Sequence, residues 1–162
     1  MKRRTFLQAG LAAAALLSLP LAIDAGRERK ARMIEKIHKS EAEWKQLLTP
    51  EQFNVLRQAG TERAFSSSLN KEYGQGSYVC AGCDLPLFES DTKFDSGTGW
   101  PSFYAPIEGS VETKRDFMMI LPRTEYHCAR CGGHQGHVFN DGPEPTGQRW
   151  CNNGVALKFI PS

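Results

Sequence analysis

Two C-x-x-C motifs constrain this chain more than any other feature. They are Cys80-Ala81-Gly82-Cys83 and Cys128-Ala129-Arg130-Cys131, and each can place two thiolates on one ion, with backbone N–H groups of the tight turn directed toward the sulfurs. Together they supply four thiolates, which complete a tetrahedral set. We therefore predict one structural zinc ion held by Cys80, Cys83, Cys128 and Cys131. A filled coordination sphere has no position for a catalytic water, so its role would be stability.

Two other interpretations of these cysteines remain open at this point. Two disulfides are the ordinary expectation for an exported protein, and C-x-x-C is also the motif of thioredoxin-like redox sites. Neither motif stands in the strand-to-helix setting of thioredoxins, and a matched pair is a strong zinc signal. The long segment between the motifs favours two distant hairpins joined by one ion. Zinc binding would leave Cys151 as the only free thiol of the five cysteines.

The N-terminus has the pattern of a secretory signal peptide over residues 1–25. Three basic residues precede an apolar stretch from Phe6 to Leu19, and small residues end at Ala25. A transmembrane anchor is the alternative, but the apolar run is shorter than the ~20 residues that a span usually needs. Arg3-Arg4-Thr5-Phe6-Leu7-Gln8 resembles the twin-arginine export signal, with an unspecialised signal as the alternative. We expect a periplasmic or otherwise exported protein.

This export route carries proteins that are already folded, which bears on the cysteines. A zinc site could form in the reducing cytoplasm before the thiols meet an oxidising compartment. The remaining sequence suits one domain, predicted over 37–162 after a basic, flexible linker over 26–36. Without residues 1–25 the chain has 17 basic and 17 acidic residues. That balance argues against nucleic acid as a partner, because phosphate binding needs concentrated Lys and Arg.

The secondary-structure pattern predicts a helix pair followed by a β-rich body. Ser40 with Glu43 forms a capping box for a short helix to Leu48, and Thr49 with Pro50 starts a second helix that stops at Gly60. Short β-prone segments then alternate with turn residues, which indicates a mainly β fold: a small antiparallel barrel-like domain with N-terminal helices. The predicted strands are 76–79, 87–88, 103–106, 111–113, 117–121, 125–127, 137–139, 149–151 and 156–159.

Cys151 stands among residues that suit thiol chemistry. A lone cysteine is most often an inert buried hydrophobe, but Arg149 can favour its thiolate electrostatically. Asn153, two residues on in a strand, would project from the same face and could hold a polar ligand. His134 and His137 lie three apart between glycines and could donate a proton, bind a metal or merely serve a turn.

The loop from Phe94 to Phe103 places two glycines beside Trp100. It could present an aromatic wall to a ligand, or simply bury a core tryptophan in a turn. The pattern alone does not separate these readings.

Several long motifs resemble one family, in order and with sensible spacing. They are FDSGTGWPSF at Phe94–Phe103, CARCGGHQGHVF at Cys128–Phe139, RWCNN at Arg149–Asn153, TERAF at Thr61–Phe65, the knuckle at Cys80–Cys83 and the pair Asp141–Gly142. From about Ser40 to Phe159 the chain is similar to peptide-methionine (R)-S-oxide reductases of the MsrB type. The resemblance implies a β-barrel-like domain that reduces the R epimer of methionine sulfoxide, free or in oxidised proteins, with structural zinc away from the active site.

The resemblance also implies residue roles. Cys151 would be the nucleophile, and Trp100 would cradle the substrate methyl group. His134, His137 and Asn153 would organise the sulfoxide oxygen and a bound water. Arg149 would assist the thiolate.

Two positions depart from the family pattern. Many members carry a resolving cysteine where this chain has Thr98, and the family usually has Ser where it has Gly154. With four cysteines on zinc no internal disulfide partner remains, so we expect the Cys151 sulfenic acid to be reduced by a thioredoxin-like or other external thiol reductant. We expect a monomer. A zinc-ribbon interaction module and a redox sensor without turnover are the competing functions.

Overall fold

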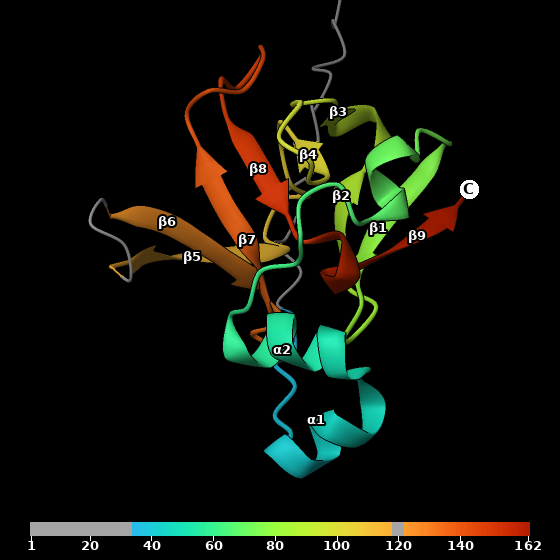
Figure 1. Cartoon of the computed structure of the whole chain (residues 1–162), viewed down its shortest axis with the longest axis vertical. Helices are drawn as coiled ribbons and strands as arrows, with labels where there is room; N and C mark the ends of the chain where they lie inside the picture. Colours follow the sequence, from blue (N-terminus) through green and yellow to red (C-terminus); the bar gives the residue numbers. More distant parts are fainter. Residues whose placement is uncertain (1–33, 118–121) are drawn as a thin grey trace, which may run out of the picture. The chain divides into compact units, whose positions relative to one another are not determined.

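The structure is a computed structural model that describes residues 34–117 and 122–162 (Figure 1). The signal peptide predicted over 1–25, most of the linker predicted over 26–36, and the strand predicted over 117–121 except Phe117 lie outside the described residues. Phe117 is in no strand. At the end of the predicted linker, Ile34 packs against the core and Lys36 pairs with Glu112. No helix in the described ranges has the length and apolar character to cross a membrane.

Two short helices begin where the capping residues predict. Helix α1 spans Glu41–Leu47 with a capping box between Ser40 and Glu43, and α2 spans Pro50–Gln58 with a box between Thr49 and Gln52. Each box satisfies two backbone N–H groups that a helix start leaves unpaired. Helix α2 ends at Ala59 in a left-handed conformation and buries three apolar side chains, Phe53, Val55 and Leu56.

The described residues form nine antiparallel strands in two sheets. The smaller sheet has the order β2-β1-β9, and the larger has the order β3-β4-β8-β7-β6-β5. The strands are β1 Gly76–Cys80, β2 Pro86–Glu89, β3 Lys93–Phe94, β4 Ser102–Phe103, β5 Val111–Asp116, β6 Arg123–Cys128, β7 His134–Phe139, β8 Arg149–Asn152 and β9 Leu157–Pro161. The mainly β, antiparallel class with N-terminal helices is confirmed, although the described strands form two sheets and no closed barrel.

Individual strands differ from the prediction mostly at their ends. The segment predicted as Phe103–Pro106 is strand only at Ser102–Phe103, and β3 was not predicted. Strand β8 ends at Asn152, so placing Asn153 within this strand was wrong by one residue. A 3-10 turn, η3, covers Gly154–Ala156 before β9 begins, and two further turns of this kind are η1 Ser68–Lys71 and η2 Ser90–Thr92.

Aromatic rings from both sheets build the core. Phe88 of the smaller sheet stacks on Phe103 of the larger one at 4.2 Å between ring centroids, and Tyr78 meets Phe103 edge-on at 4.9 Å. Tyr126 packs edge-on against Trp150 at 5.0 Å. Such pairs stabilise the core beyond the area that they bury, so one aromatic cluster joins the two sheets.

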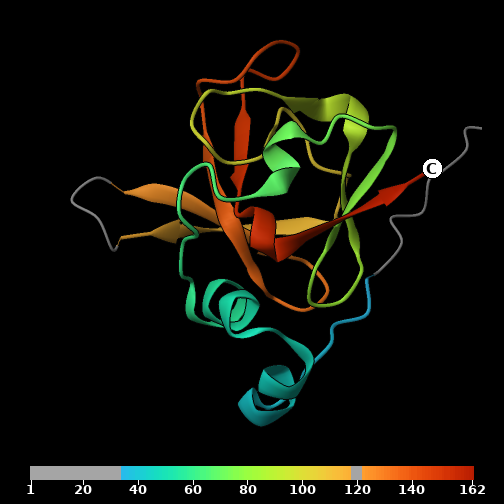
Figure 2. The same cartoon turned by 45° about the vertical axis from the view of Figure 1, so that its right-hand side comes forward.

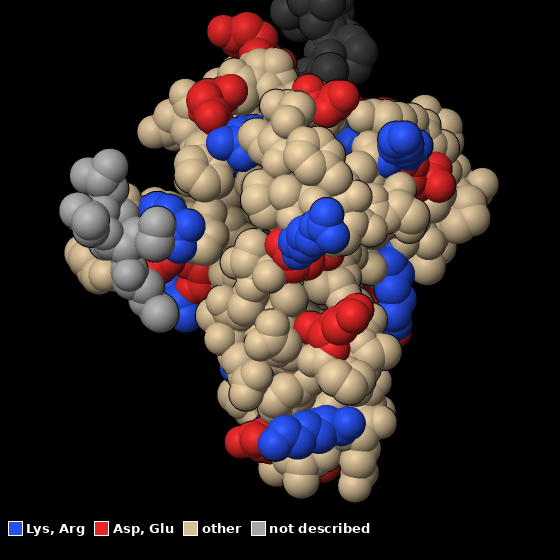
Figure 3. Space-filling model, in the orientation of Figure 1, with Lys and Arg blue, Asp and Glu red and all other residues tan. Residues whose placement is uncertain are grey.

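The helices and the loop that joins β7 to β8 lie in different parts of the domain. In both views α1 and α2 lie together at one end, and the loop that joins β7 to β8 rises at the opposite end (Figures 1 and 2). On the face of Figure 3, Lys and Arg alternate with Asp and Glu without a patch of one sign. This distribution agrees with the balanced charge of the sequence after residue 25.

Candidate active site and cysteine cluster

The four cysteines of the two C-x-x-C motifs converge on one point. All four Sγ atoms lie within 4.8 Å of one another. The closest pairs cross between the motifs: Cys80 to Cys131 at 3.7 Å and Cys83 to Cys128 at 3.5 Å. Ligands of a tetrahedral ion at ~2.3 Å would lie about 3.8 Å apart, whereas a disulfide needs ~2.05 Å. The cluster therefore fits one metal ion, and all five cysteines are free thiols.

The surroundings of the cluster fix this geometry. In each motif a backbone N–H closes a turn on the carbonyl of the first cysteine, from Asp84 to Cys80 at 2.9 Å and from Gly132 to Cys128 at 2.8 Å. Arg57 of α2 donates to the Cys131 carbonyl at 3.0 Å. Hydrogen bonds with the neighbouring thiols raise the pKa of Cys80 far above its ordinary value. A bound cation would lower this pKa again, because a metal ion binds and stabilises the thiolate form.

The fifth cysteine lies in the larger sheet, away from the two turns of the cluster. Cys151 sits on β8 between two neighbours, opposite Ser102 of β4 and opposite His137 of β7. Its side chain is partly exposed. Trp100 stands in the loop just before β4, so the sheet register brings the predicted nucleophile, one predicted histidine and the predicted aromatic wall to one region.

Opposing influences set the protonation of Cys151. Burial raises the pKa of the Cys151 thiol, while the charge of Arg149 and a hydrogen bond with Thr98 lower it, and burial prevails. The Arg149 guanidinium also donates to the Asp141 carboxylate at 2.8 and 2.9 Å, so Asp141 shares its charge. Cys151 is therefore mostly a neutral thiol near pH 7.

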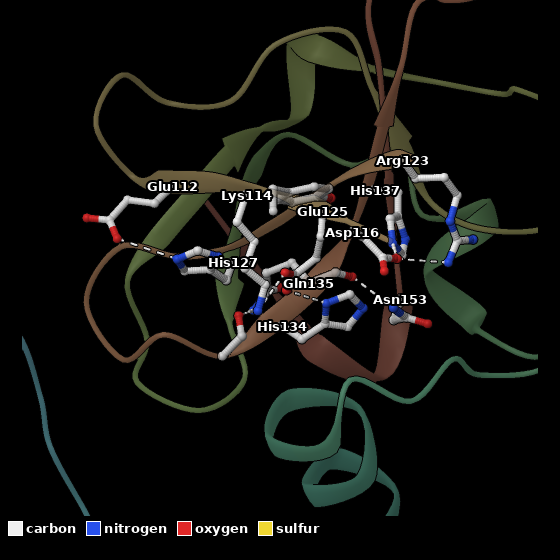
Figure 4. A network of polar contacts seen from close by, with 12 residues as sticks. Glu112, Lys114, Asp116, Arg123, Glu125, His127, His134, Gln135, His137 and Asn153 are labelled. Carbon is white, nitrogen blue, oxygen red and sulfur yellow. Dashed lines mark hydrogen bonds and ion pairs between the residues drawn. The ribbon is translucent and has the colours of Figure 1, made fainter. Parts of the chain in front are cut away.

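Both predicted histidines are held by carboxylates (Figure 4). Glu125 of β6 contacts His134 Nδ1 at 2.7 Å, and Asp116 of β5 contacts His137 Nε2 at 2.8 Å. The two imidazole rings lie edge-to-face at 5.5 Å between centroids. Burial lowers the pKa of His134 to about 4, and it lowers that of His137 as well. Both rings are neutral at physiological pH.

Asn153 and Trp100 meet at one residue that the sequence reasoning did not assign. The Glu62 backbone N–H donates to Asn153 Oδ1 at 3.0 Å, and its carbonyl accepts from Trp100 Nε1 at 3.2 Å. Its carboxylate accepts from the N–H groups of Gly154 and Val155 at 2.6 and 2.8 Å. Asn153 Nδ2 donates to the Gln135 carbonyl at 2.9 Å, so both ends of this amide bind the protein itself.

The sequence analysis also did not assign several other residues around the site. Buried Gln135 and Asn152 contact each other at 3.4 Å, and Tyr126 donates to Asn152 at 2.6 Å. Glu62 stands in the TERAF motif, which was a usable signal. Glu125 and Asp116 carried no signal, because a single acid in a strand is ordinarily a solvated residue and only the fold shows its burial.

The structure gives a reason for the unusual Gly154. A Cβ on Gly154 would lie 2.0 Å from Ser67 Oγ and 2.5 Å from Ser67 Cβ. The Ser67 side chain therefore occupies the space that a residue larger than glycine would need. The other departure, Thr98, lowers the pKa of the Cys151 thiol, and its own hydroxyl is hydrogen-bonded to that of Ser96 at 2.8 Å.

Comparisons with known proteins show the family to which the chain belongs. Residues 48–161 match the SelR domain family. The chain is 54% identical to peptide methionine sulfoxide reductase MsrB of Leptospira interrogans, over 76% of this chain and 95% of that protein. It is 58% identical to the MsrB of Methanosarcina mazei over 76% and 89%, and 58% identical to peptide methionine sulfoxide reductase B1, chloroplastic, of Arabidopsis thaliana over 74% and 60%. The chain belongs to the MsrB family of peptide methionine sulfoxide reductases.

Proposed function

We propose that this protein reduces the R epimer of methionine sulfoxide, in peptides and oxidised proteins and as the free amino acid, with Cys151 as the nucleophile. The observation that carries the proposal is the place of Cys151: the one thiol outside the cysteine cluster lies in register with His137 and beside the loop of Trp100. Membership of the MsrB family supports the reaction class.

The reaction needs a nucleophile and a proton donor at the sulfoxide. Sulfoxide sulfur is a poor electrophile until its oxygen is hydrogen-bonded or protonated. Attack by the Cys151 sulfur breaks the S–O bond of the substrate and transfers the oxygen, which gives methionine and Cys151 sulfenic acid. The hydrogen of the Cys151 thiol ends on the oxygen of the sulfenic acid, so no proton is gained or lost overall. Cys151 is oxidised by two electrons and the sulfoxide is reduced by two.

Each side chain around Cys151 has a part in this step. Trp100, held at its Nε1 by Glu62, offers a flat apolar surface to the substrate methyl group. His134 and His137 hold the sulfoxide oxygen and a bound water, and Arg149 stabilises the thiolate. Asn153, whose own amide is engaged on both sides, acts by fixing the turn after Cys151 to the loop of Glu62.

An external thiol reductant completes the cycle. A first thiol condenses with the sulfenic acid to a mixed disulfide and releases water, and a second thiol returns Cys151 and leaves as a disulfide. Thr98 cannot supply a thiol, and the other four cysteines belong to the cluster. The chemistry of a four-thiolate set favours zinc as the ion, with a structural role, since these residues would hold it without an open position.

A racemic substrate with dithiothreitol tests the activity. Zinc-loaded protein should consume half of racemic dabsylated methionine sulfoxide, the R half, and Cys151→Ser should consume none. Absence of turnover by the wild type would refute the reductase and favour an interaction module or a redox sensor. If Cys151 formed a stoichiometric disulfide within the protein while zinc stayed bound, this result would refute regeneration by an external thiol.

We also propose export to the periplasm by the twin-arginine route. Support comes from the Arg3-Arg4 pair ahead of Phe6 and Leu7 in the sequence. Replacement of both arginines by lysine should leave the protein in the cytoplasm, as measured by cell fractionation. Unchanged export of that variant would refute the proposal.

A further inference from the structure

The β5–β6 hairpin supplies one carboxylate to each histidine of the site, at opposite ring nitrogens. Glu125 Oε1 lies 2.7 Å from His134 Nδ1, and Asp116 Oδ2 lies 2.8 Å from His137 Nε2 (Figure 4). An ionised carboxylate can only accept hydrogen bonds. Each bonded ring nitrogen must therefore carry the hydrogen, and the two histidines hold it at different positions.

A cation on the same hairpin keeps each carboxylate ionised. Lys114 Nζ lies 2.8 Å from Glu125 Oε2, and Arg123 Nη2 lies 3.0 Å from Asp116 Oδ2. An opposite charge at this distance favours the ionised form of a carboxyl group. Glu125 is only 5% exposed and Asp116 15%, whereas Lys114 is 64% and Arg123 35% exposed, so each carboxylate is buried while its cation reaches solvent. The hairpin thus presents two fixed acceptors to the histidines.

The second nitrogen of His134 is left without a partner. Among the described residues His134 Nε2 is buried and has no hydrogen bond. A buried polar atom without a partner costs about 1–3 kcal/mol. A ligand that donates a hydrogen bond to this nitrogen would remove the cost. The His134 ring lies edge-to-face against that of His137, and His137 is opposite Cys151 in the pairing of β7 with β8. With the hydrogen on Nδ1, Nε2 can only accept.

Resting on the function proposed above, we infer that Glu125 and Asp116 are positioning residues that fix His134 as the Nδ1–H tautomer and His137 as the Nε2–H tautomer. His134 then presents a bare Nε2 to the substrate. It binds a water through one hydrogen of that water, which leaves the other hydrogen directed to the sulfoxide oxygen. The imidazole orients the proton donor and does not give up a proton of its own.

The charges around His134 agree with a neutral ring. Lys114, Asp116, Arg123, Glu125, His127 and His137 face it from β5, β6 and β7. Burial, Lys114, His127 and Arg123 lower its pKa, and Asp116 raises it. Glu125 in contact also favours the charged ring. The influences that lower the pKa of His134 prevail, so the ring is neutral and the Glu125 carboxylate can determine which of its nitrogens carries the hydrogen.

Tautomers can be read directly by NMR, independently of turnover. In long-range ¹H–¹⁵N spectra of the zinc-loaded wild type at pH 7.5, His134 should show the Nδ1–H pattern and His137 the Nε2–H pattern. In Glu125→Gln, the Lys114 ammonium should stay paired with the oxygen of the new glutamine amide. The NH₂ group of that amide then faces His134 Nδ1. The hydrogen should then move to Nε2, and kcat should fall about ten- to a hundred-fold with KM changed less than twofold.

A matched control lies on the same hairpin. Glu112 of β5 pairs with Lys36 and His127, so Glu112→Gln should leave the His134 tautomer and kcat unchanged. Glu125→Asp, which keeps the charge, should restore part of kcat. An Nε2–H pattern for His134 in the wild type, or an unchanged tautomer or kcat in Glu125→Gln, would overturn the inference. Should Glu125→Gln not fold, the wild-type spectrum decides alone, and a wild type without R-sulfoxide turnover would instead refute the proposed function.

Discussion

The cysteine cluster and the candidate site around Cys151, which includes His134, His137, Trp100 and Asn153, each contain cysteine but differ in how far their polar groups are satisfied. In the cluster, four Sγ atoms lie within 4.8 Å of one another and can together bind one ion. In the Cys151 site, the thiol is partly exposed, and among the described residues His134 Nε2 is buried without a hydrogen-bond partner. The first arrangement is closed and suits stability. The second retains unsatisfied groups, which cost free energy in the resting protein and are available to a ligand.

The two regions also differ in how they are assembled. Each half of the cluster is a four-residue turn that the local sequence specifies. The Cys151 site draws on strands β4, β7 and β8 and on the loop of Glu62, which come together only through sheet register. A substitution in the cluster should therefore act on folding, and one in the Cys151 site should act on chemistry.

The largest expected effect separates the two regions by a pair of serine variants. Cys151→Ser should lower turnover more than 10³-fold and leave the thermal midpoint within about 2 °C, because the chemistry loses its nucleophile while packing is kept. Cys128→Ser should release the metal and lower the midpoint on the order of 10 °C. Turnover with dithiothreitol, calorimetry and metal content measure both. A Cys128→Ser protein of wild-type midpoint would contradict a structural role for the cluster.

Acid should destabilise the protein through the histidines of the Cys151 site. The folded-state pKa of His134 is about 4, below the unfolded value of 6.5, because burial disfavours the charged ring. The unfolded chain therefore binds the proton first as the pH falls. Stability is full above pH 6.5 and is lost between pH 6.5 and 4, by at most about 3 kcal/mol since Glu125 in contact opposes the lowering.

Urea unfolding at pH 7.5 and pH 4.5 measures this loss. His134→Gln should show a smaller loss over the same range, because it removes the titrating ring. Exposed His38 provides the control, and His38→Gln should behave as the wild type does. Equal stability of the wild type at the two pH values would contradict the burial of neutral His134.

Gly154 offers a test of packing in the turn that follows Cys151 and Asn153. Gly154→Ser, which introduces the usual family residue, should destabilise by about 1–3 kcal/mol, because the new Cβ would meet Ser67 Oγ at 2.0 Å. Ser67→Gly removes the obstructing atoms at the cost of a weak cap on Leu69. The double variant should be more stable than Gly154→Ser alone. Additive effects in this cycle would show that the two positions do not compete for space.

The cluster could be predicted almost completely from the sequence, and so could the helix starts. C-x-x-C turns and the capping boxes at Ser40 and Thr49 are local, so a few residues specify their geometry. Strand β3 and the end of β8 were not predicted correctly. A two-residue strand exists only through its partner, and Asn153 leaves the sheet because its amide is held by Glu62 and Gln135.

For the Cys151 site, the resemblance to a family identified the central residues but not the carboxylates that hold the histidines. Cys151, Trp100 and the histidines stand in long motifs. Glu125 and Asp116 acquire their roles from burial and from pairing along the β5–β6 hairpin, and sequence spacing carries no information on either. Thr98 was noted only as a missing cysteine. Its contact with Cys151 depends on the fold of the glycine loop.

The smallest expected effect concerns that contact. Thr98 lowers the pKa of Cys151 against the raising effect of burial, so Thr98→Val should raise this pKa by less than about one unit. The pH profile of iodoacetamide alkylation should shift upward, and turnover at pH 7 should fall only a few-fold. Cys151→Ser identifies the alkylated thiol. An unchanged or lowered profile would mean that Thr98 does not stabilise the Cys151 thiolate, and that Arg149 opposes the effect of burial without help from the loop.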